Sequence, residues 1–149
     1  MSINIITSGI HHVALRVANF QLSKKFYIDQ LGFQIVLEKP NLFVFMAGNT
    51  AIGIVGPDTK TKDGDIFSPF RVGLDHLAMI CESETELERV AQALNKEGIQ
   101  NTGVKLDETL GKRYVAFKDP DKISLEFYMK NRPVQDHRHD EHRIFFLQP

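Results

Sequence analysis

Hydrophobic and polar positions alternate over several short segments of the chain, a period of two that is typical of strands with one buried face. Residues 12–17 form the first such segment, in which an apolar set alternates with a mixed one: Val13, Leu15 and Val17 against His12, Ala14 and Arg16. The apolar set should pack on a helix, which leaves His12 on the opposite, concave face of a sheet. His11 has the opposite parity and is interpreted as a structural residue.

Two other segments have the period of an amphipathic helix. In the clearer one, Ser83 and Glu86 have capping-box spacing, and Gly98 supplies the left-handed residue that ends the helix. Between them lies one apolar stripe, formed by Leu87, Val90, Ala91 and Leu94. The other helix is predicted over about residues 20–31, with a rougher stripe and Gly32 at its end.

These elements recur in the same order in both halves of the chain. Residues 10–33 (IHHVALRVANFQLSKKFYIDQLGF) and 74–99 (LDHLAMICESETELERVAQALNKEGI) each contain a His-apolar-Ala-apolar strand, a turn, a helix and a final glycine. Three strand-like segments follow each helix: 34–38, 42–47 and 51–55, then 102–106, 113–118 and 124–128. We therefore predict a single α+β domain of two βαβββ modules. Its expected parts are module 1 at about 9–56, a polar linker at 57–71, module 2 at about 72–130 and a C-terminal tail at 131–149.

Composition narrows the range of partners. With 18 basic and 19 acidic residues among 149, the net charge is −1. This balance gives no electrostatic reason to expect nucleic acid or an anionic membrane as the main binding partner. The single cysteine, Cys81, excludes an intrachain disulfide and suits a reducing compartment. No secretory signal is evident, and no apolar run approaches the roughly 18 residues that span a bilayer. A cytoplasmic location is the expectation.

Three potential metal ligands share the parity of the concave face. His76 alternates with Leu77, and Glu126 lies between two apolar residues of the last strand. An inward-facing carboxylate is costly without a partner. Two imidazoles with a carboxylate suit a non-haem iron site, or a catalytic zinc or manganese site. A histidine taken alone on a half-buried strand is more often a hydrogen-bonded packing residue than a ligand, and the cluster His137, His139 and His142 is better interpreted as a solvated polar tail.

Arg16 lies four residues beyond His12 on the same face, about 13 Å away at the rise of a strand. There it would meet an anionic group of a substrate, or pair with a rim carboxylate such as Glu38.

Taken together, these motifs resemble the vicinal oxygen chelate (glyoxalase/bleomycin resistance/dioxygenase) superfamily. The resemblance rests on the strands IHHVALRV and LDHLAMIC, the helix end FYIDQLGF and the closing segment YVAFKDPDKISLEFY, and it extends over residues 10–130. It implies a glyoxalase-like fold whose modules form a curved mixed sheet. It also implies one divalent metal per chain (Fe, Mn, Zn or Ni), with His12, His76 and Glu126 as its ligands.

The chain departs from members of the superfamily at informative positions. Glyoxalase I and methylmalonyl-CoA epimerase take a fourth ligand from the last strand of module 1, where this chain has Gly53. Extradiol dioxygenases have a tyrosine acid near Ala116, for which Tyr114 is the nearest substitute. Arg16 matches an arginine of glyoxalase I, and Lys122 replaces the usual glycine of the DPDG turn.

Two functions of different kind follow from the resemblance. The first is a metal-dependent lyase, isomerase or dioxygenase that chelates a small oxygen-rich molecule, with Tyr114 or Tyr128 moving protons and Arg16 and Glu38 contacting the substrate. The second is a metal-free protein of the bleomycin-resistance type that sequesters a small molecule. In both cases a homodimer is expected, to which the apolar segment Ile144–Leu147 could contribute.

Overall fold

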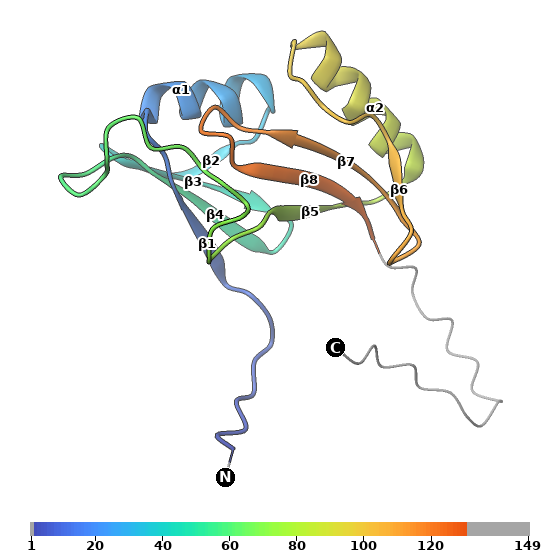
Figure 1. Cartoon of the computed structure of the whole chain (residues 1–149), viewed down its shortest axis with the longest axis horizontal. Coiled ribbons are helices and arrows are strands. Elements are labelled where there is room, and N and C mark those ends of the chain that lie inside the picture. The colour runs from blue at the N-terminus through green and yellow to red at the C-terminus, as the bar shows by residue number, and fades with distance from the viewer. Residues whose placement is uncertain (1, 131–149) are drawn as a thin grey trace.

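The first half of the chain folds into a four-stranded mixed sheet (Figure 1). The structure is a computed structural model that describes residues 2–130. The strands of this first sheet follow the order β1-β4-β3-β2. β1 is parallel to β4, and the other neighbours are antiparallel. The strand bounds are β1 (His12–Arg16), β2 (Ile35–Lys39), β3 (Leu42–Ala47) and β4 (Thr50–Val55).

The second half repeats this topology with the order β5-β8-β7-β6, in which β5 is parallel to β8. Its strands are β5 (Leu77–Cys81), β6 (Lys105–Asp107), β7 (Lys112–Lys118) and β8 (Ser124–Met129). The predicted α+β fold of two βαβββ modules is confirmed. β6 is shorter than predicted and begins at Lys105. Before it, the backbone N–H of Thr102 donates to the carbonyl oxygen of Ala116, and the Thr102 hydroxyl accepts from the backbone N–H of Ala116.

One helical segment follows the first strand of each module. α2 (Glu84–Lys96) begins as the capping pattern predicted, with the Ser83 hydroxyl accepting from the backbone N–H of Glu86. The first segment, predicted as one helix, consists of α1 (Phe20–Lys24) and a π-helical continuation, η1 (Lys25–Gln30). The wider π-helical turn buries the adjacent residues Phe26 and Tyr27 together, which explains the irregular apolar stripe.

The two modules share one hydrophobic core, which lies between the helical segments and the sheets. Leu15, Phe43 and Ile54 contribute from the first sheet, as the predicted parity of β1 requires. Val115 and Leu125 contribute from the second. The modules are therefore packed against each other through buried side chains.

A hydrogen-bonded junction reinforces this contact. The Tyr27 hydroxyl in η1 donates to Oδ2 of Asp119, which lies in the turn between β7 and β8 (2.9 Å). Oδ1 of Asp119 accepts from the backbone N–H groups of Asp121 and Ile123. Asp121 in turn accepts from the backbone N–H of Ala18. Burial raises the pKa of Asp119 to about 6.

Among residues 2–130, no helix is long and apolar enough to cross a membrane. The tail from residue 131, with its three histidines and the segment Ile144–Leu147, lies outside the described residues.

Candidate functional site

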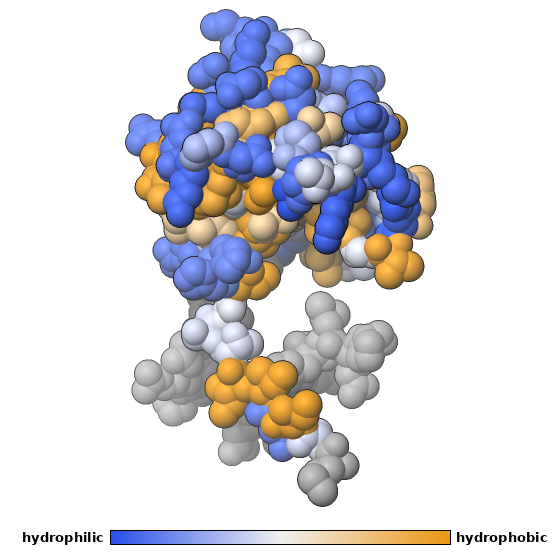
Figure 2. All heavy atoms as spheres, turned by 90° about the vertical axis from the view of Figure 1, so that its left-hand side faces the viewer, coloured by the Kyte–Doolittle hydropathy of each residue, from blue (hydrophilic) through white to orange (hydrophobic). Residues whose placement is uncertain are grey.

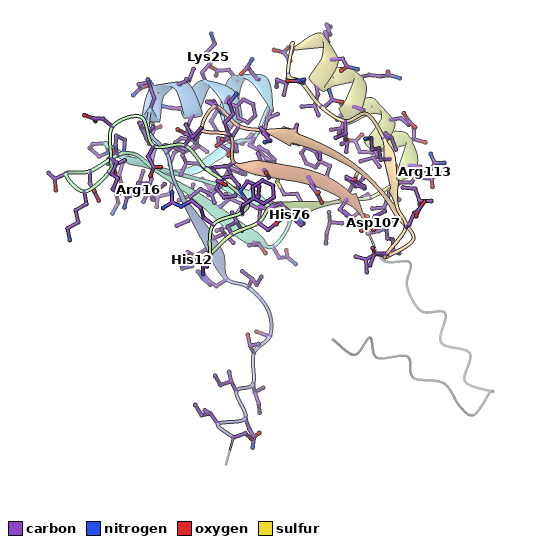
Figure 3. All side chains as sticks on the ribbon, in the orientation of Figure 1. His12, Arg16, Lys25, His76, Asp107 and Arg113 are labelled. Carbon is purple, nitrogen blue, oxygen red and sulfur yellow. The ribbon has the colours of Figure 1, made fainter. Side chains whose placement is uncertain are left out.

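Each sheet has one face that the helical segments leave uncovered. In the first sheet, His12 is paired with Ala51 and Ala14 with Gly53, and all four positions have the parity opposite to the buried core. His12 and His76 both lie on the side of the sheets away from the helices (Figure 3). His12 is thus on the face that the alternation of β1 predicted, and His76, which directly precedes β5, lies on the same side of the sheets.

His76 and Glu126 come together at the start of the second sheet. Nε2 of His76 lies 3.6 Å from Oε2 of Glu126. The Glu126 side chain is 17% exposed, and burial raises the pKa of its carboxyl above the ordinary value. The pKa of His76 is also raised, first by the hydrogen bond with Asp75 and also by the charge of Glu126. Both groups therefore bind a proton more readily than they do in water.

Each of the two histidines also has a side-chain partner directly before it in the chain. Nδ1 of His76 lies 2.6 Å from Oδ1 of Asp75. Nδ1 of His12 lies 2.8 Å from Nδ1 of His11, with the two rings edge to face. The interpretation of His11 as a residue of the opposite face is wrong, because His11 precedes β1 and is free of its alternation. Asp75 was not predicted as a site residue, although a carboxylate directly before a candidate ligand histidine indicates such a role.

His12, the third candidate ligand, does not lie beside His76 and Glu126 within one chain. Over residues 2–130 there is no group of three or more His, Cys, Asp or Glu side chains that could hold a metal ion. The expectation that His12, His76 and Glu126 meet on one sheet assumed that β1 and β5 share a sheet. In the structure β1 and β5 are edge strands of separate sheets.

Two hollows meet at His76 and Glu126. One, of about 740 Å³, extends over the second sheet and is lined by Tyr114, Tyr128 and Asp107. The other, of about 1020 Å³, is lined by Asp75 and by residues of the loop before β5 and of the turn after β7. A molecule in either hollow has access to the imidazole and the carboxylate.

The two tyrosines of the first hollow lie side by side on β7 and β8. Their rings are stacked, with centroids 5.8 Å apart. The Tyr128 hydroxyl donates to Oδ2 of Asp107 at 2.7 Å. Partial burial, and then this bond, raise the pKa of Tyr128 to about 12, so its hydroxyl is a proton donor at neutral pH.

Arg16 and Glu38 are not neighbours. Arg16 donates to the carbonyl oxygen of Gly56 (2.6 Å) and pairs with Asp58 (3.4 Å). Glu38 is paired in register with the buried Phe43 and binds Lys24 of α1, so it lies on the helix-facing side. The prediction that Glu38 contacts Arg16 or a substrate on the concave face is wrong, because a register shift between Ile35 and Leu37 changes the face that later residues of β2 occupy.

Gly53 occupies the position to which the sequence resemblance assigned the fourth metal ligand of glyoxalase I and methylmalonyl-CoA epimerase. It lies on the concave face beside Ala14 and has no donor atom in a side chain. A Cβ placed there would be 3.6 Å from Cδ1 of Leu42, an ordinary van der Waals contact. The position is therefore sterically able to take a side chain.

Comparison with known proteins agrees with this architecture. Residues 9–127 match the model of the Glyoxalase/Bleomycin resistance protein/Dioxygenase superfamily. The chain belongs to this superfamily. Its relatives include the uncharacterized protein YwkD of Bacillus subtilis, 30% identical over 135 residues, which cover 83% of this chain and 98% of YwkD.

Solved structures of the superfamily have the same fold. A glyoxalase family protein from Enterococcus faecalis superposes with a TM-score of 0.67 and 31% identity, over 81% of this chain and 97% of that one. Lactoylglutathione lyase from Agrobacterium tumefaciens gives a TM-score of 0.66 at 21% identity, over 83% and 94% of the two chains. That similarity establishes the fold alone.

Proposed function

We propose that the protein is a divalent-metal-dependent enzyme that binds a small oxygen-rich molecule through a metal held by His12, His76 and Glu126. The observation that supports this most strongly is the approach of His76 Nε2 to Glu126 Oε2 at 3.6 Å. Donor atoms that share one ion at about 2.1 Å lie about 3.0–3.5 Å apart, so a small adjustment accommodates a metal between them. A cation there would also compensate the half-buried carboxylate of Glu126.

The third ligand, His12, is proposed to come from a second copy of the chain. One chain gathers two of the three donors over its described residues, and β1 and β5 are edge strands that each pair on one side only, with β4 and β8. Apolar side chains are exposed near these faces, among them Leu37, Met46 and Ile80. Figure 2 shows apolar surface interspersed with polar groups on the side of the molecule that faces the viewer. A homodimer that pairs first and second modules would complete the site and cover this surface.

With three protein ligands, a metal of coordination number five or six keeps two or three positions for a substrate. A metal held by these three residues would supply Lewis-acid chemistry at a carbonyl oxygen of the substrate. Tyr128 is proposed to hold and deliver a proton, because its hydroxyl stays protonated and faces the same hollow as Glu126. Tyr114 packs on Tyr128 and is proposed to contact the substrate beside it, and Arg16 to meet an anionic group.

The reaction class is proposed to be oxygen insertion, or addition and elimination next to a carbonyl. Gly53 argues against efficient isomerisation of the methylglyoxal–glutathione hemithioacetal, since it offers no fourth ligand and no base on the concave face. The test compares hemithioacetal isomerisation with oxygen uptake on catechols after anaerobic reconstitution with Fe(II) or Mn(II). We expect little or no isomerisation of the hemithioacetal. Activity is expected instead in the oxygen-uptake assay, or on other substrates that undergo addition and elimination next to a carbonyl. Efficient isomerisation by the unchanged protein would refute the three-ligand site.

A metal-free binding protein of the bleomycin-resistance type is the second candidate. The separation of His12 from His76 and Glu126 within one chain favours it, and a fold alone does not fix a function. It predicts that chelators leave ligand binding unchanged.

A further inference from the structure

The residue directly before each candidate ligand histidine contacts the same ring atom in both modules. Oδ1 of Asp75 lies 2.6 Å from Nδ1 of His76, and Nδ1 of His11 lies 2.8 Å from Nδ1 of His12. The two modules thus repeat this contact with different side chains. In each case Nδ1 has a partner within hydrogen-bond distance, whereas Nε2 forms no hydrogen bond among the described residues.

The contact with Asp75 determines which nitrogen of His76 bears the proton. An ionised carboxylate only accepts hydrogen bonds, so Nδ1 of a neutral His76 must donate to Asp75. The lone pair then resides on Nε2, the atom that lies 3.6 Å from Glu126. A metal that binds between His76 and Glu126 needs this tautomer, and outer carboxylates that fix a ligand histidine in this way are a general feature of metal sites.

A purely structural role does not explain the contact. The Asp75 side chain is 75% exposed, and among residues 2–130 its hydrogen bond and ion pair are with His76 alone. A bond between adjacent, exposed side chains joins no distant parts of the fold and contributes little to stability. Its consequence is local: it orients the His76 ring.

We propose that Asp75 and His11 are positioning residues: Asp75 holds His76 in the tautomer and orientation in which Nε2 binds the metal, and His11 holds the ring of His12 in the matching orientation. This inference rests on the proposed metal site, and it assigns a role to two residues outside the ligand set.

The first experiment needs no metal. Nitrogen-15 NMR of the metal-free full-length protein, at a pH where imidazoles are neutral, reports the tautomer of His76. We expect the Nδ1–H form in the wild type and a mixture dominated by the Nε2–H form in Asp75→Ala. An unchanged His76 tautomer in Asp75→Ala would overturn the proposal for Asp75.

The second experiment measures Mn(II) affinity by calorimetry. Asp75→Ala and His11→Ala should each weaken binding about 10- to 100-fold, the usual effect of removing an outer partner of a metal ligand. Asp75→Asn, which keeps an acceptor oxygen, should lose less than Asp75→Ala. The matched control is Asp65→Ala, which removes another exposed carboxylate, one that pairs with Arg71, and should bind Mn(II) as the wild type does.

The outcomes separate this inference from the proposed function. If the wild type binds Mn(II) and neither Asp75→Ala nor His11→Ala weakens it, the positioning role is wrong while the metal site stands. If the wild type binds no Mn(II), Fe(II) or Zn(II), the metal site itself is wrong, and the positioning role is overturned with it. Thermal unfolding of each variant should match that of the wild type.

Discussion

Gly53 is the single residue that most restricts the chemistry of the proposed site. It lies on the concave face of β4, beside β1, and an added Cβ meets only ordinary contacts. A glutamate at this position would direct a carboxylate toward the face that His12 occupies. Gly53→Glu should therefore bind Mn(II) or Ni(II) more tightly than the wild type, by about tenfold for one added charged ligand, and should gain hemithioacetal isomerase activity.

Gly53→Ala is the matched control, since it fills the same space without a donor. It should leave metal affinity unchanged. Equal behaviour of the Glu and Ala variants would show that Gly53 does not face the metal.

Residue parity allowed part of this site to be predicted from the sequence. The alternation in β1 and β8 correctly placed His12 and Glu126, because the strands are regular and one face of each is buried. Glu38 was misplaced, since a register shift in β2 leaves no mark in a sequence of apolar and charged residues. The contacts of His11 and Asp75 depend on backbone geometry just before a strand, where alternation gives no information.

At the level of elements, the π-helical η1 and the β7–β8 turn determine how the modules meet. An amphipathic pattern predicts an α-helix. It does not predict the wider π-helical turn that buries both Phe26 and Tyr27. The turn DPD was readable as a turn, but its contact with Tyr27, some 92 positions away in sequence, was not. The order of elements along the chain followed from the repeat, whereas the strand order within each sheet and the junction between the repeats required the structure.

This junction makes stability depend on pH. Asp119 is 3% exposed, and burial raises its pKa from 3.8 to about 6. The folded state therefore binds this proton more tightly than the unfolded state, so the stabilisation is complete below about pH 4 and is lost as the pH rises through about 6. The loss corresponds to roughly 3 kcal/mol at about 1.4 kcal/mol for each pH unit between the two pKa values.

Asp119→Asn provides the reference, because its amide does not titrate. The free energy of unfolding in urea, measured for both proteins at about pH 4 and about pH 7, should show the wild type losing roughly 2.4 kcal/mol relative to the variant. A constant difference between the two proteins would mean that Asp119 titrates at its ordinary pKa.

For the whole molecule, the account predicts a homodimer with shared metal sites. Light scattering should give twice the chain mass of 17.0 kDa at micromolar concentration. If His12 of one copy serves His76 and Glu126 of another, His12→Ala and His76→Ala should each bind metal poorly, and a refolded mixture should recover about a quarter of the sites. A monomeric mass, or no recovery on mixing, would place the third ligand elsewhere.

The most direct test of the central claim is elemental analysis of the gently purified full-length protein. We expect about one divalent ion per chain, lost on His76→Ala because removing a ligand opens the site. His139→Ala, which removes a histidine of the tail, should retain the metal. A wild-type protein that is metal-free, gains no metal on reconstitution and is indifferent to chelators would contradict the metal-dependent function and favour the binding protein.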